Sequence, residues 1–151
     1  MIIRKAKQSD IEEIAHVEIA SGYHKKRFYA SPMIKKLFKD KYENVFVLED
    51  KTKILGYITL KNKNKIGELG LLAVTKTAQK KGFGLRLIKF ILKYAKKIGC
   101  NKIFLDVRKD NYKAISLYKK LGFKVVRINK KKINNKIYLK LRMEKKFIFM
   151  F

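Results

Sequence analysis

A short glycine-containing turn, Gln79-Lys80-Lys81-Gly82-Phe83-Gly84, joins an apolar run to a strongly amphipathic run. The run before it, 69–74, has the composition of a strand buried on both faces, and the run after it, 85–98, has its apolar residues at helical spacing. The first N–H groups of a helix lack intrahelical partners and lie at the positive end of its dipole. This turn is therefore typical of a phosphate site, because Gly82 and Gly84 have no Cβ to keep a ligand away from the backbone.

Two other phosphate-binding loops do not fit this turn. The P-loop ends in Gly-Lys-Ser/Thr, and the dinucleotide fingerprint has three glycines with an acidic residue about 20 residues later. Neither pattern is present. The spacing Gln-x-x-Gly-x-Gly after Ala73-Val74 instead resembles the acyl-coenzyme A signature of the GNAT superfamily of N-acetyltransferases.

A second stretch resembles the other GNAT signature, Asn-x-x-Ala-x-x-Leu-Tyr-x-x-Leu-Gly-Phe. Residues 111–123 read Asn-Tyr-Lys-Ala-Ile-Ser-Leu-Tyr-Lys-Lys-Leu-Gly-Phe and match at every fixed position. Before it, Leu105-Asp106-Val107-Arg108 is similar to the Leu-Glu-Val-Arg strand of ribosomal-protein alanine N-acetyltransferases. The chain is thus identified as a member of the GNAT superfamily, closest in motif to that type.

The resemblance implies a GNAT fold of the α/β (α+β) class, with a mixed central sheet of about seven strands and four helices. The fourth strand, 68–74, would carry a bulge and splay from the fifth, 102–107. The residue pattern itself predicts that a capping box, Ser9-Asp10-Ile11-Glu12, starts the first helix. After a loop at 22–31, Ser31-Pro32 is expected to supply the cap and first-turn proline of the second helix.

At 151 residues the chain is expected to be a single domain, 1–151. Its apolar end, 147–151, has no obvious place and could extend the last strand, cover an edge or join a homodimer. Cys100 is the one cysteine, the N-terminus lacks the apolar stretch of a signal peptide, and no run approaches the roughly 18 apolar residues of a membrane span. These patterns predict a cytoplasmic protein without a membrane segment.

The resemblance implies that acetyl-coenzyme A binds as a co-substrate in the cleft between the splayed strands. It also implies that the site uses no metal. Its pantetheine amides would pair with backbone groups of the fourth strand, and its pyrophosphate would accept hydrogen bonds from the glycine turn. Asn111 would touch the pantetheine arm or cap its helix, and the aromatic, basic loop at 22–31 would be a wall of the acceptor site or a lid over the core. The expected cofactor-binding residues are Leu72, Ala73, Val74, Gln79, Lys80, Lys81, Gly82, Phe83, Gly84, Asn111 and Tyr118, and the expected acceptor-binding residues are Tyr23, Arg27 and Tyr29.

The implied reaction is direct attack of a primary amine on the thioester. Tyr118 matches the family's general acid, and a phenol with an ordinary pKa of about 10 is protonated at pH 7. The N–H of Val74 would stabilise the oxyanion. Asp106 stands where the similar strand has a glutamate base, and its shorter side chain would need a bridging water. Glu68 is the competing base; either carboxylate could instead pair with a lysine, and Tyr118 could instead cap the core.

The net charge of +27, from 39 basic and 12 acidic residues, has two explanations. Lysines spread over every surface fit an AT-rich genome, and a basic surface also fits a polyanionic partner such as RNA or the ribosome. Three functions therefore stay open: N-acetylation of a protein N-terminus or small amine, acetylation of the amine of an aminoacyl-tRNA, and non-catalytic RNA binding on the same fold. The two intact motifs argue against the third.

Overall fold

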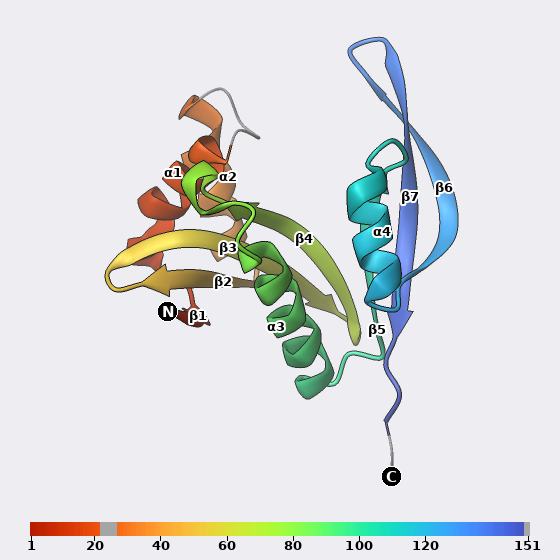
Figure 1. Ribbon diagram of the computed structural model, residues 1–151, viewed down its shortest axis with the longest axis horizontal. Coiled ribbons are helices and arrows are strands. Elements are labelled where there is room, and N and C mark those ends of the chain that lie inside the picture. Colours follow the sequence, from red (N-terminus) through yellow and green to blue (C-terminus); the bar gives the residue numbers. More distant parts are fainter. Residues whose placement is uncertain (22–26, 150–151) are drawn as a thin grey trace.

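The computed structural model describes residues 1–21 and 27–149. A mixed sheet has the strand order β1-β2-β3-β4-β5-β7-β6, and α-helices pack on both of its faces (Figure 1). The seven strands and four α-helices expected from the sequence are confirmed within these residues. The strands are β1 (Ile2–Lys5), β2 (Glu43–Asp50), β3 (Lys53–Lys63), β4 (Ile66–Val74), β5 (Lys102–Arg108), β6 (Lys124–Ile133) and β7 (Lys136–Lys146); the helices are α1 (Ile11–Ala20), α2 (Arg27–Lys39), α3 (Phe83–Lys97) and α4 (Tyr112–Lys120), with short 3-10 turns at Gln8–Asp10 and Lys76–Ala78.

The predicted splay between β4 and β5 is confirmed. The two strands are parallel and pair only from Ile66 to Glu68, against Lys102 to Phe104. Beyond that point β4 continues to pair with β3, while β5 pairs with β7 and diverges from β4. The molecule therefore opens into two halves, of which one contains β5, α4 and the β6–β7 hairpin (Figure 1). The predicted bulge is also present in β4, where the register with β3 shifts and the N–H of Leu71 donates to the Thr59 hydroxyl at 2.8 Å.

Two apolar clusters hold the helices to the sheet. The larger one packs α3 and α4 against one face, and the smaller one packs α1 and α2 against the other face of β2, β3 and β4. Because side chains alternate along a strand, Leu105 and Val107 of β5 point into the larger cluster and their neighbours point to the opposite face. We call this opposite face of β5, β7 and β6 the arm face; by strand register it carries Phe104, Asp106, Arg108, Arg127, Lys131, Lys136, Tyr138, Lys140 and Arg142.

The first helix begins at Ile11, within the predicted stretch, but its predicted capping box and the predicted start of the second helix are wrong. Asp10, rather than Ser9, organises the first: its carboxylate accepts a 2.7 Å hydrogen bond from the N–H of Lys7 and pairs with Arg4 at 2.8 Å, so a 3-10 turn precedes α1. The second helix has already begun at Arg27, which places Pro32 inside it. An interior proline loses one backbone hydrogen bond, and here the full burial of Ala30 and Ile34 offsets that loss.

The β6–β7 hairpin is longer than the sequence pattern predicted, although its turn lies at the expected Asn134-Asn135. Both asparagines have positive φ, 50° and 64°, the left-handed geometry of a two-residue hairpin turn. After β7 the N–H of Phe147 donates to the carbonyl of Asn101 at 2.9 Å, and the Phe147 ring packs on the larger cluster. A homodimer through the C-terminal residues stays a prediction. Within the described residues, no helix is both long enough and apolar enough to cross a membrane.

Candidate active site

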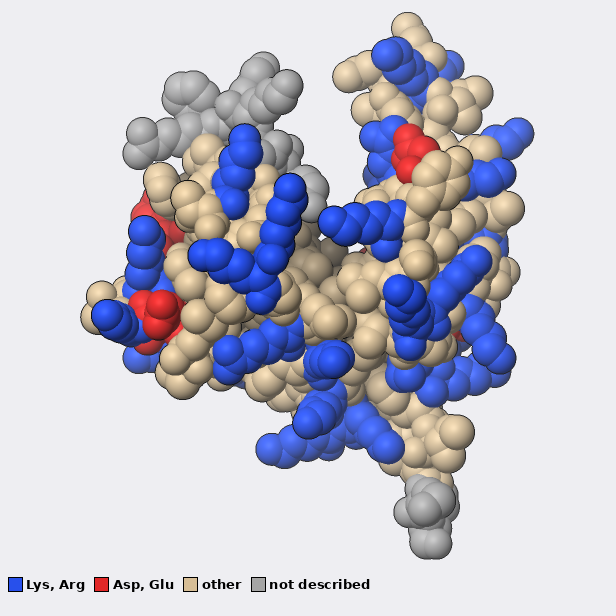
Figure 2. Space-filling view, in the orientation of Figure 1, with Lys and Arg blue, Asp and Glu red and all other residues tan. Residues whose placement is uncertain are grey.

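The divergence of β4 from β5 leaves a cleft of about 800 Å³. Side chains of β4, β5, α3 and α4 line it, and Leu69 and Gly70 lie near the point where the two strands part. A smaller pocket of about 210 Å³ at the glycine turn shares Leu72 and Gly84 with the cleft, so the two adjoin. Figure 2 shows the cleft as a hollow between the two halves, with basic side chains on both rims.

The glycine turn has the geometry of a phosphate site. Gly82 is the N-cap of α3 with φ +82°, and a Cβ at Gly82 or Gly84 would meet nothing within 4 Å. The space in front of the helix is therefore open. The N–H of Arg86 donates to the Gly82 carbonyl at 3.0 Å, which closes the first helical turn, so the N–H groups just before Arg86 have no helical carbonyl to bond. A diphosphate fits these donors.

The end of β4 presents backbone groups to the cleft. The N–H of Thr75 donates to the carbonyl of Leu55 on β3 at 2.9 Å. Because successive backbone groups of a strand point in opposite directions, the N–H of Val74 points away from β3 and toward the gap. The Gln79 side chain donates to the Val74 carbonyl at 2.9 Å and to the Ser21 carbonyl at 3.3 Å, so it fixes the strand end beside the glycine turn.

Tyr118 of α4 lines the cleft and is partly buried. Its ring meets that of Phe123 edge-on, with centroids 5.5 Å apart. The N–H groups of Leu121 and Phe123 both donate to the Tyr118 carbonyl, at 3.1 and 3.0 Å, and Gly122 between them has φ +94°. The Leu-Gly-Phe end of the second motif therefore holds Tyr118 in place.

Asn111 both lines the cleft and caps α4, because its side-chain oxygen accepts a hydrogen bond from the N–H of Ala114 at 3.2 Å. The capping role considered from the sequence is confirmed. A contact with a pantetheine arm stays a prediction.

Asp106 also lines the cleft, from the arm face of β5. Its carboxylate accepts two hydrogen bonds from the guanidinium of Arg142, at 3.0 and 2.9 Å. These bonds, with further attraction from Lys140 and Arg127, hold the pKa of Asp106 below its usual value. The side chain is therefore ionised at neutral pH, and its partner is an arginine of β7.

Glu68, the competing carboxylate, lies where β4 and β5 are still joined, opposite Phe104 on one side and Lys61 on the other. It is absent from the residues that line the cleft as the structure describes it. The fold thus brings Tyr118 and Asp106 to one cavity, whereas Glu68 stands at the last residue pair before β4 and β5 part and does not line that cavity.

The predicted acceptor-binding residues are described only in part. Tyr23 lies outside the described residues, and Arg27 and Tyr29 lie in the first turn of α2, where the description covers the backbone alone. Their roles stay predictions. Of residues 1–21 and 27–149, no three His, Cys, Asp or Glu side chains gather as metal ligands would.

Sequence reasoning missed Arg142 and Lys140 beside Asp106. The available signal was the alternation along 137–143, which places these two side chains on one face together with Tyr138. That pattern indicates which residues share a face, whereas the pairing with β5 depends on register between distant segments.

Comparisons with known proteins show the family and the fold of this chain. The Acetyltransferase (GNAT) family matches residues 5–123. YvbK, an uncharacterized N-acetyltransferase of Bacillus subtilis, is 34% identical over 73 residues, which are 48% of this chain and 47% of that protein. An N-alpha-acetyltransferase of Sulfurisphaera tokodaii is 27% identical over 139 residues, 83% of this chain and 81% of that protein.

Among solved structures, the ribosomal-protein-S18-alanine N-acetyltransferase from Escherichia coli is similar over 99% of this chain and 95% of its own, with a TM-score of 0.85 and 20% identity. That likeness concerns the fold. The chain spans less than half the length of several curated relatives it matches, among them proteins of Arabidopsis thaliana and Bacillus subtilis. Because the family match covers most of the chain, the chain belongs to the GNAT acetyltransferase family.

Proposed function

We propose that the protein is an acetyl-coenzyme A-dependent N-acetyltransferase whose acceptor is an α-amino group. The observation that carries the proposal is that the cleft lined by Tyr118 and Asp106 adjoins the pocket at the open glycine turn and the end of β4. An N-alpha-acetyltransferase among the relatives that cover most of this chain supports it.

The residues present fit acetyl-coenzyme A. The open space before α3, with the free donors of its first turn, suits the pyrophosphate, and Lys80 and Lys81 beside it are exposed cations. The apolar walls of the cleft suit the pantetheine arm, whose amides would bond backbone groups of Leu72 and Val74 in the place of a missing strand.

In the proposed reaction the acceptor nitrogen forms a bond to the acetyl carbon as the carbon–sulfur bond breaks. The N–H of Val74 donates to the oxygen that becomes negative, which is the usual role of a backbone oxyanion donor. Tyr118 gives its phenolic proton to the departing sulfur. Asp106 receives the proton of the amine through one water, because its side chain is short.

The state of Asp106 favours an α-amine over a lysine side chain. A carboxylate whose pKa is held down by Arg142 is a weak base and cannot pull a proton from a strongly basic amine. An α-amine has an ordinary pKa of about 7.7–8.0, so roughly a tenth of it is neutral at pH 7, whereas a lysine with a pKa of about 10.4 is almost fully charged.

A pair of peptides tests the proposal. The first begins with a free alanine and contains no lysine, and the second has a blocked N-terminus and one lysine. Thiol release from acetyl-coenzyme A is expected with the first and at background level with the second. Release with the lysine peptide alone would contradict the assignment of an α-amine acceptor.

A further inference from the structure

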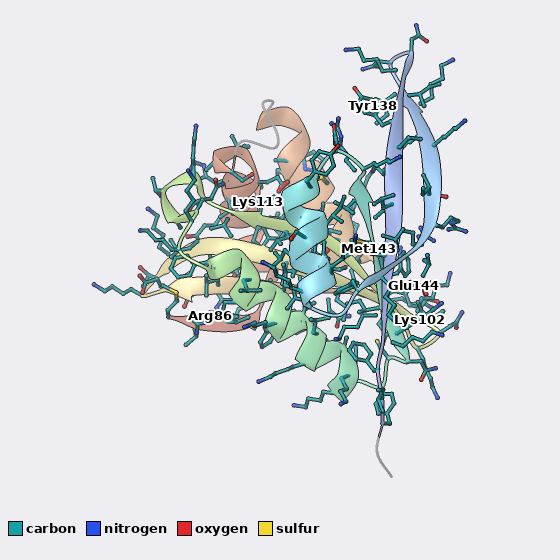
Figure 3. The ribbon with its side chains drawn as sticks, turned by 45° about the vertical axis from the view of Figure 1, so that its right-hand side comes forward. Arg86, Lys102, Lys113, Tyr138, Met143 and Glu144 are labelled. Carbon is teal, nitrogen blue, oxygen red and sulfur yellow. The ribbon has the colours of Figure 1, made fainter. Side chains whose placement is uncertain are left out.

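A further pocket, of about 410 Å³, lies where β5 leads into α4. It shares Arg108 with the cleft, so the two adjoin, and the proposed acetyl transfer leaves it unused. Tyr112, the first residue of α4, is 77% exposed, so no described part of the chain covers its ring. Tyr138 lines the pocket from β7, and Figure 3 shows it above the start of α4, from which Lys113 projects.

The lining of this pocket combines planar side chains, two tyrosine rings and a guanidinium group, with positive charge. The guanidinium of Arg108 lies over the Tyr138 ring, 4.6 Å from its centroid, and pairs with Asp110 at 2.9 Å. Asp110, the carboxylate in the lining, is therefore paired with a cation, and Lys109 in the same lining adds a positive charge. Tyrosine rings and arginine planes are the surfaces on which unpaired nucleic-acid bases stack, and such sites are sequence-tolerant.

The neighbouring arm face supplies cations in a regular row. Lys136, Tyr138 and Lys140 alternate along β7 on one face, and Lys131 of β6 stands directly opposite Tyr138. Alternate residues of a strand repeat about every 6.6 Å, so Lys136 and Lys140 lie about 13 Å apart on β7, with Tyr138 between them and Lys131 on the neighbouring strand. Among the described residues no carboxylate forms an ion pair with Lys131, Lys136 or Lys140.

Lysines also cover other surfaces, so charge alone does not single out this one. The outer face of α3 carries Lys89 and Lys93, with no pair of tyrosines beside them in a pocket that adjoins the cleft. The arm face differs because its cations surround an aromatic pocket next to Asp106. A basic peptide would be repelled there, whereas a phosphate chain would be attracted.

We propose that this pocket and the arm face bind the single-stranded end of an RNA, and that the acceptor is an amino acid esterified to tRNA; this rests on the proposed N-acetyltransferase activity. A base stacks at Tyr112 and Tyr138, and phosphates lie on Lys131, Lys136 and Lys140. The esterified amino acid then extends past Arg108 into the cleft. Its nitrogen gains the acetyl group, Asp106 takes the amine proton through water, the sulfur takes the Tyr118 proton, and the ester to RNA stays intact.

Binding of labelled tRNA over a salt series tests the surface without any catalysis. Each lost phosphate contact lowers the slope of log affinity against log salt by about 1, so Lys131→Ala with Lys140→Ala should lower it by about 2. Tyr112→Ala should weaken binding about 5- to 100-fold at every salt concentration, because stacking of one base is worth about 1–3 kcal/mol. Tyr112→Phe keeps the ring and should keep the affinity.

A double change on α3, Lys89→Ala with Lys93→Ala, is the matched control because it removes the same charge from another face. It should leave both the slope and the affinity near wild type. If this control lowers tRNA binding as much as the arm-face pair does, the binding is general attraction and the proposal is wrong. Thermal unfolding of each variant confirms that the fold is kept.

Acetyl transfer from labelled acetyl-coenzyme A to aminoacyl-tRNA tests the substrate class. Label should appear on the amino acid released by mild base, and Tyr112→Ala should raise KM for the charged tRNA while acetyl-coenzyme A affinity is kept.

Label on free peptides alone would overturn the RNA-linked acceptor and leave the proposed N-acetyltransferase activity in place. If no amine is labelled while tRNA still binds through Tyr112, the proposed activity has failed and the RNA surface stands. If Tyr112→Ala weakens acetyl-coenzyme A binding instead, the pocket holds the cofactor's adenine and the proposal is wrong.

Discussion

Arg142 on β7 donates two hydrogen bonds to Asp106 on β5, at 3.0 and 2.9 Å, at the edge of the cleft. Both side chains are about a quarter exposed, 27% for Arg142 and 29% for Asp106, so the pair contributes only about 0–1 kcal/mol to folding. Its consequence is for chemistry: it orients the Asp106 carboxylate and keeps it charged over the pH range in which an amine loses its proton.

Two carboxylate substitutions distinguish the candidate bases. Asp106→Asn should lower kcat about 100-fold, the lower end of the range for acid–base groups, because an α-amine needs only a weak base. Glu68→Gln should change kcat less than about threefold, since Glu68 is not among the residues that line the cleft. Steady-state kinetics with one α-amine acceptor gives both values. A larger effect at Glu68 than at Asp106 would assign the base to Glu68.

The pH profile identifies which group limits activity in acid. The pKa of Asp106 lies below its ordinary 3.8, so this carboxylate is ionised throughout the working range. The acid limb of kcat/KM should therefore belong to the α-amine and fall tenfold per pH unit below about pH 7.7–8.0. Asp106→Asn should lower the whole curve without moving this limb. A limb that moves with the substitution would show that Asp106 titrates there.

Acetyl-coenzyme A binding tests the glycine turn. Gly82→Val should weaken binding about 10- to 100-fold, because hydrogen bonds to a charged group contribute about 1.5–3 kcal/mol and a side chain there keeps the phosphates away. Gly99→Val is the matched control: Gly99 also has positive φ, +89° against +82°, with open space around it, at the far end of α3. Calorimetry should show near wild-type affinity for Gly99→Val. Equal losses in the two variants would attribute the effect to backbone strain.

Asp10 gives a stability prediction in acid. Two hydrogen bonds from Arg4 and one from the N–H of Lys7 lower its pKa below the ordinary 3.8. A group with a depressed pKa stabilises the fold above its unfolded pKa, and this contribution is lost as pH falls through the folded pKa. Urea unfolding should therefore show that wild type loses more stability between pH 6 and pH 3 than Asp10→Asn does. Parallel losses would contradict the role of Asp10.

Local patterns predicted most of the helices and strands, and the resemblance to the GNAT family implied the splayed sheet with its cleft. The glycines, the amphipathic run of α3 and the 111–123 motif all act through nearby residues, so their spacing indicates their structure. Helix starts were less predictable, because Asp10 is positioned by Arg4, which Glu49 also binds, and α2 by the burial of Ala30 and Ile34. These are tertiary contacts that no local pattern reports.

The acceptor side of the cleft was the least predictable part, because it too depends on contacts between distant segments. The pairing of Asp106 with Arg142 depends on the register of β5 against β7, two strands separated by α4 and β6. Tyr57 offers a similar case in the smaller cluster, where its hydroxyl donates to the buried Glu18 at 2.6 Å. Neither residue of that pair stood out in the sequence.

Tyr118→Phe tests the central claim, that this cleft performs acetyl transfer, most directly. The change removes one hydroxyl and keeps the ring that packs on Phe123, so folding and acetyl-coenzyme A affinity should hold. If the departing sulfur takes its proton from Tyr118, kcat for an α-amine acceptor should fall about 10²–10⁴-fold. Wild-type kcat in Tyr118→Phe, with unchanged acetyl-coenzyme A affinity, would contradict the account.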